Sequence, residues 1–96
     1  MGFSSEFSND DLPGGDLISA GLRDVNEGRE TIPSLLVSIG ASRLRRAGIM
    51  VPHPFASPES RLYELLREEV SDGAHSRYNA LIRRLVSFER AAECAR

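Results

Sequence analysis

The end of the chain carries an uninterrupted heptad of apolar residues, and this pattern restricts the fold more than any other feature. From position 74 to position 95 the spacings are 4, 3, 4, 3, 4 and 3. The residues concerned are Ala74, Tyr78, Leu81, Leu85, Phe88, Ala92 and Ala95. An α-helix places residues at these spacings on one side, and Ile82 and Val86 widen the stripe. Such a helix is about 33 Å long, so the rest of the chain must pack along it.

A second helical segment precedes the long one. Residues 58–70 have an apolar side formed by Leu62, Leu65, Leu66 and Val70. The residues "SDG" at 71–73 form a turn. Two helices joined by so short a turn pack as an antiparallel hairpin, which is what we expect for this half of the chain.

Two shorter helical segments come earlier. In the first, residues 16–28, Ile18, Leu22 and Val25 follow helical spacing and Gly28 provides a stop. The second is expected to run from 31 to about 47 as one helix, with Thr31 as N-cap and a proline in its first turn.

The expected end of the second helix has a specific signature. With Gly48 in the left-handed position after the helix, Leu44 and Ile49 occupy the two positions whose apolar contact accompanies a Schellman cap. The proline-rich stretch "VPHPFASP" then forms an extended connector, in which Val51 and Phe55 are available to contact the core. Ser57 is expected to start the next helix as Thr31 does.

These segments predict an all-α protein, a small bundle of about four helices in which the last is the longest and pairs with the third. Residues 14–96 form the single helical domain, and residues 1–13 are predicted to be a flexible acidic tail. A lone cysteine, Cys94, permits no intrachain disulfide and favours a reducing cytoplasm. The sequence shows no membrane-spanning run and no signal peptide. The use of arginine without any lysine suggests a bacterial source with a GC-rich genome.

Three arginines cluster at the end of the second helix. Arg43, Arg45 and Arg46 do not share one face at about 100° per residue, whereas a phosphate-binding stripe would align them. Cations in a last helical turn also interact favourably with the helix dipole. We favour this capping role and keep nucleic-acid contact through Arg43, Arg46, Arg83 and Arg84 as the alternative. Because Arg43 falls in the apolar arc of the helix, we expect an acidic partner for it on another helix.

The long helix offers a candidate interface. A stripe of this kind commonly packs against the other helices of its own chain. Because the last helix is much longer than the first two, its far end can also extend beyond them, and Phe88, Ala92 and Ala95 would then contact a second copy or another protein. The arginines at 83 and 84, mixed with Glu89 and Glu93, are read as a solvated face.

No catalytic or metal motif is visible. His75 near Asp72 fits a helix start as well as a relay, and no nucleophile with an oxyanion-type turn lies nearby. His53, His75 and Cys94 lack metal-ligand spacing. We therefore predict no enzyme and no cofactor, and instead a small bacterial cytoplasmic interaction module that acts by helix-helix contact.

Overall fold

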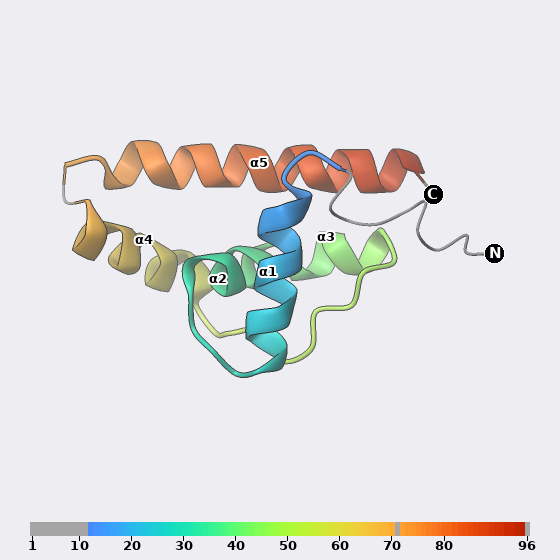
Figure 1. The fold of residues 1–96 in the computed structure, drawn as a ribbon, viewed down its shortest axis with the longest axis horizontal. Helices are drawn as coiled ribbons and strands as arrows, with labels where there is room; N and C mark the ends of the chain where they lie inside the picture. The colour runs from blue at the N-terminus through green and yellow to red at the C-terminus, as the bar shows by residue number, and fades with distance from the viewer. Residues whose placement is uncertain (1–11, 71, 96) are drawn as a thin grey trace.

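The protein is all-helical in the computed structural model, which describes residues 12–70 and 72–95 (Figure 1). The described residues form α1 (Gly15–Asn26), α2 (Ile32–Ile39), α3 (Ala41–Arg46), α4 (Pro58–Glu69) and α5 (Ala74–Ala95). The long helix α5 spans one side of the molecule, and α1 runs across the line of the others (Figure 1). The expectation of a small helical bundle is confirmed, with five helices in place of about four.

A glycine on α1 allows it to approach α2 closely. A Cβ added at Gly21 would lie 2.3 Å from the carbonyl oxygen of Pro33 and 2.7 Å from Val37 Cγ1. Only a residue without a side chain tolerates this contact with another backbone. At its far end α1 stops as predicted at Gly28, whose φ is 76°.

The start of α2 is built as predicted around Thr31. Its hydroxyl accepts a hydrogen bond from the Ser34 backbone N–H at 3.2 Å, and Ser34 Oγ accepts one from the Thr31 N–H at 2.7 Å. This reciprocal capping box satisfies backbone donors that the first turn leaves without helical partners. The Thr31 hydroxyl also donates to Asp24 Oδ2 of α1 at 2.8 Å, which ties the two helices together.

The predicted single helix over 31–47 is wrong in one respect, because it divides at Gly40. This residue ends α2 and precedes α3. A Cβ at Gly40 would lie 2.7 Å from Glu89 Oε2 and 2.9 Å from Leu85 Cδ1, so the junction presses directly on α5. The helical wheel drawn through both parts therefore does not hold, and the side chain of Arg43 is 66% exposed rather than directed into the apolar arc.

The predicted cap at the end of α3 is confirmed. The Ile49 N–H donates to the Leu44 carbonyl at 2.8 Å, and the Gly48 N–H donates to the Arg45 carbonyl at 2.9 Å. Gly48 has a φ of 91°, the left-handed conformation that a Schellman motif requires. Leu44 is fully buried, as the apolar contact of this motif demands.

The connector after α3 is attached to α2. Val51 is buried, and the Phe55 N–H donates to Ser38 Oγ at 3.1 Å. Ser57 does not act as Thr31 does: its φ is 47° and its side chain makes no cap hydrogen bond. Instead Pro58, with its fixed φ and missing N–H, begins α4.

A two-pronged ion pair holds the start of α4 against the loop after α1. Arg61 donates to both carboxylate oxygens of Glu30, at 3.0 and 2.6 Å. These hydrogen bonds lower the pKa of Glu30 below its ordinary value. α4 then packs on α2 and on α5, where Tyr63 and Tyr78 lie 5.7 Å apart between ring centroids.

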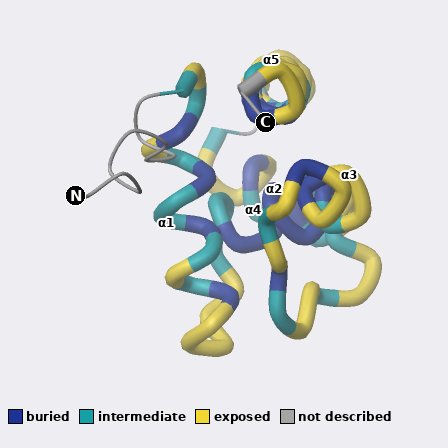
Figure 2. The backbone as a smooth tube through the Cα atoms, turned by 90° about the vertical axis from the view of Figure 1, so that its right-hand side faces the viewer, coloured by how far each residue is buried: buried dark blue, intermediate teal, exposed yellow. Residues whose placement is uncertain are grey.

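The inner stripe of α5 forms the centre of the core. We call its described members the core seam: Ala74, Tyr78, Leu81, Leu85, Phe88 and Ala92. Phe88 is fully buried and Ala92 is 6% exposed, so the expectation that these two side chains are left for a partner is wrong. After the junction at Gly40, α3 lies beneath the C-terminal half of α5 and contacts it, so this end of α5 is also covered within the chain (Figures 1 and 2). The side chain of Ala95 lies outside the described part of the chain.

Most of the predicted acidic tail also lies outside the described residues. Leu12, near the end of this segment, is half-buried against the core, and its carbonyl accepts a hydrogen bond from the Gly15 N–H at 2.8 Å. Among the helices of residues 12–70 and 72–95, none has the length and apolar character needed to cross a membrane.

Candidate functional site

A groove runs along one flank of α5, beside the junction of α2 and α3. We call it the flank groove; its volume is about 270 Å³. Its two sides are formed by Ile39, Ser42 and Arg43 from α2 and α3, and by Ile82, Val86 and Glu89 from α5. The three apolar side chains are only half-buried, so the groove exposes branched aliphatic surface beside charged groups.

A buried carboxylate lies at the end of this groove. Glu89 is only 5% exposed, although it sits among charged residues in the sequence. Its Oε1 lies 3.6 Å from Arg43 Nη1, so the acidic partner expected for Arg43 is present on another helix. We expected the guanidinium of Arg43 to be the buried group of this pair. In the structure the carboxylate of Glu89 is buried and the guanidinium lies at the rim.

Burial raises the pKa of Glu89 above its ordinary value. The Arg43 guanidinium opposes this shift, whereas the negative charge of Glu93 adds to it. A contact of 3.6 Å to an exposed guanidinium replaces water only in part, so the carboxylate keeps capacity to accept further hydrogen bonds. The groove therefore combines apolar surface with an acceptor that is poorly solvated.

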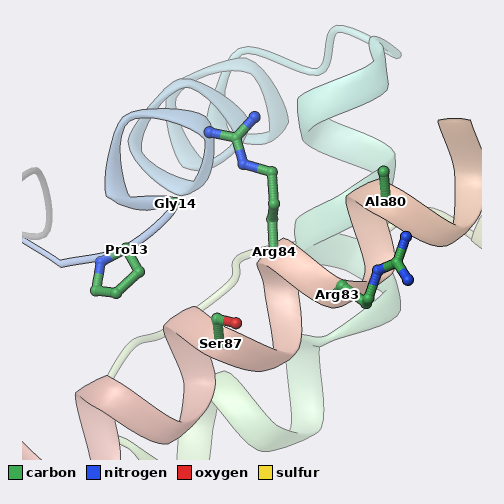
Figure 3. Close-up of a pocket in the computed structure, with 6 residues that line it drawn as sticks. All are labelled: Pro13, Gly14, Ala80, Arg83, Arg84 and Ser87. Atoms are coloured by element: carbon green, nitrogen blue, oxygen red, sulfur yellow. The ribbon is translucent and has the colours of Figure 1, made fainter.

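A second hollow lies on the opposite flank of α5, with a volume of about 330 Å³ (Figure 3). It is lined by Pro13, Gly14, Ala80, Arg83, Arg84 and Ser87. The side chain of Arg84 reaches over α1, where Nη2 lies 3.5 Å from Asp16 Oδ1, while Arg83 points in a different direction (Figure 3). The two guanidinium groups do not converge on one point, and a bound phosphate group would require convergence.

Arg43 and Arg84, which we considered for nucleic-acid contact, form ion pairs with other helices. Arg43 contacts Glu89 and Arg84 contacts Asp16. Arg46 and Arg83 lie on exposed parts of α3 and α5. Contact with nucleic acid through this set stays a prediction.

The histidine considered for a relay is on the surface. His75 Nε2 lies 3.2 Å from Asn79 Nδ2, and the His75 ring lies 6.5 Å from that of Tyr63. Within the part of the chain that the structure describes, no group of three or more His, Cys, Asp or Glu side chains is placed to hold a metal ion. Cys94 is exposed.

Comparison with known proteins yields no relative. The sequence matches no protein-family model, no curated protein and no solved structure.

The sequence does not predict this groove. From the sequence we expect Ile82 and Val86 at the margin of the core seam and Glu89 on a solvated face; in the structure Ile82 and Val86 are half-buried in the groove and Glu89 is buried. A usable signal was present: Ile82, Val86 and Glu89 are spaced by 4 and 3 residues, a stripe beside the core seam rather than part of it. The burial of Glu89 could not be read from the sequence, because it depends on the approach of Gly40 from a distant segment.

Proposed function

We propose that this protein is a small interaction module, with no chemistry of its own, that binds itself or a protein partner by helix-helix contact along the flank groove. The single observation that carries the proposal is the row of half-buried Ile39, Ile82 and Val86 beside the buried carboxylate of Glu89. Half-exposed aliphatic side chains with one oriented polar group are typical of contact surfaces. The proposed interface thus contains Ile82 and Val86 of α5 in place of Phe88 and Ala92, which are buried in the core.

The setting that we propose is the cytoplasm of a bacterium. It is supported by the single cysteine and by the all-arginine set of basic residues in the sequence.

The test is affinity capture from source cells with the unmodified protein and with the Val86→Asp variant, followed by identification of protein and nucleic acid in the eluate. Ser87→Asp is the matched control, since it introduces the same charge at an exposed position on the other flank of α5. We expect bound protein, including any second copy of the chain, to be lost with Val86→Asp and retained with Ser87→Asp. Capture of nucleic acid that is released by moderate salt, and is unaffected by Val86→Asp, would overturn the proposal in favour of binding through the arginines.

A further inference from the structure

A second heptad stripe runs along the flank of α5 that faces the groove. From position 75 to position 93 its spacings are 4, 3, 4, 3 and 4. At 100° per residue these residues share an arc of about 80°, whose centre lies about 100° from that of the core seam. We call this set the flank stripe: His75, Asn79, Ile82, Val86, Glu89 and Glu93.

The order of residues in the flank stripe is complementary to its own reverse. When two copies of α5 are set antiparallel with a two-fold axis halfway between Ile82 and Val86, Ile82 of each copy faces Val86 of the other. The next layer outward pairs Asn79 with Glu89. These are the reciprocal pairings that an isologous, two-fold interface requires.

The outermost layer completes the pattern. It sets His75 of one copy against Glu93 of the other, an imidazole beside a carboxylate at the exposed ends of the stripe. Every layer therefore combines groups that attract or tolerate one another, and no like charges meet.

We propose that the occupant of the flank groove is a second copy of this chain, with the two α5 helices antiparallel in this register. The inference deepens the proposed function and rests on it, because it names the partner of the same groove. It also uses the groove walls: Ile39 lies beside Ile82 and Val86, so the two copies together bring six branched aliphatic side chains around the axis. Their burial is the main favourable term for association.

The second layer accounts for the buried carboxylate. Glu89 is 5% exposed and has its contact to Arg43 at 3.6 Å. An asparagine amide carries two N–H donors. Asn79 of the second copy therefore supplies donors to Glu89 on the side that faces the groove, and Arg43 stays at the rim.

The register is tested by cross-linking between two different single-cysteine chains. In a Cys94→Ser background, a chain with His75→Cys is mixed with a chain with Glu93→Cys and oxidised mildly. Both positions are exposed, so the substitutions leave the core intact. We expect a disulfide-linked dimer in the mixture and little in either chain alone.

The matched control replaces His75→Cys by Ser76→Cys, one residue further along and about 100° around the helix. We expect its mixture with Glu93→Cys to cross-link much less. Equal cross-linking of the two mixtures, or none in either, would overturn the register.

Sedimentation of the unmodified chain over a range of concentrations tests the dimer itself. Ile82→Asp should weaken self-association about a hundredfold, since symmetry places the new charge in the interface twice. Ser87→Asp should leave it unchanged, and circular dichroism checks that both variants are folded.

If the unmodified chain is monomeric at every concentration and Val86→Asp still abolishes capture of another protein, the second copy is excluded while the proposed function stands. If Val86→Asp changes neither self-association nor capture, both fail.

Discussion

The core seam and the flank stripe share one helix and one heptad spacing, yet they differ in what covers them. Phe88 of the core seam is fully buried within its own chain, whereas Ile82 and Val86 of the flank stripe are half-buried at a groove. The difference arises from the partner elements: α2, α3 and α4 contact α5 on the inner side. Periodicity thus predicts which residues share a face, while the packing of other segments decides whether that face stabilises the fold or stays available for contact.

The largest expected effect is a difference in unfolding free energy between a substitution in the core seam and one in the flank stripe. Phe88→Ala removes a fully buried ring and should lower the free energy of unfolding by about 3 to 5 kcal/mol, through lost burial and the cavity left behind. Val86→Ala, at the half-buried flank, should cost less than about 1 kcal/mol. Denaturant unfolding at low protein concentration measures both while limiting any contribution from self-association. Similar losses for the two variants would remove the distinction between the stripes.

Phe88→Leu is a milder substitution that can still be measured if the alanine variant does not fold. It keeps most of the apolar volume and should cost less than about 1.5 kcal/mol. A graded series, with leucine less harmful than alanine, is expected only if Phe88 is packed inside the chain.

The next largest effect is expected at Gly40, which lies against Leu85 of the core seam and Glu89 of the flank stripe. Gly40→Ala places a methyl group 2.7 Å from Glu89 Oε2 and 2.9 Å from Leu85 Cδ1, so buried side-chain ends must move. We expect a loss of about 1 to 3 kcal/mol in unfolding free energy. Gly73→Ala is the control, because its nearest neighbour would be Val70 Cγ1 at 3.5 Å, an ordinary contact. Gly40→Ala as harmless as Gly73→Ala would show that the junction does not press on α5.

The buried carboxylate of Glu89 predicts a dependence of stability on pH. Because folding raises the pKa of Glu89, the folded chain holds this proton more tightly than the unfolded chain does. Its contribution to stability is present at acid pH, below the ordinary pKa of glutamate, and is lost as the pH rises through the raised value. The opposing charge of Arg43 and the like charge of Glu93 are the charged groups that act on it.

Glu89→Gln tests this dependence, because glutamine does not titrate. We expect the unmodified protein to lose stability relative to Glu89→Gln as the pH rises from acid to neutral, measured by unfolding at several pH values. Glu68→Gln, at an exposed position of α4, removes the same formal charge and should show a smaller change. A relative gain for the unmodified protein with rising pH would mean that pairing with Arg43 outweighs burial.

The sequence predicted the local structure well where the signal was local. The Thr31 cap, the Gly28 stop and the cap at Gly48 depend on a few adjacent residues, and all three are present. The heptad from Ala74 likewise gave the bounds of α5, because a long apolar stripe is the strongest helical signal.

The predictions that were wrong share a different cause. The division at Gly40 and the covering of Phe88 arise from contacts between segments far apart in the chain, which no local pattern contains. The candidate site depends on the same junction, so the sequence supplied the acidic partner of Arg43 as an expectation but could not identify Glu89 or its burial.

The smallest expected effect compares the ion pairs on the two flanks of α5. Arg84→Ala breaks an exposed pair with Asp16 and should change the free energy of unfolding by less than about 0.5 kcal/mol. Arg43→Ala should cost more, up to about 1 kcal/mol, because it leaves the buried carboxylate of Glu89 with less compensation. A double-mutant cycle of Arg43→Ala with Glu89→Gln isolates the coupling, since the arginine has no buried negative charge to compensate once glutamine replaces glutamate. Additive effects in that cycle would mean that Arg43 acts only as a surface cation, and the two flanks would then be electrostatically equivalent.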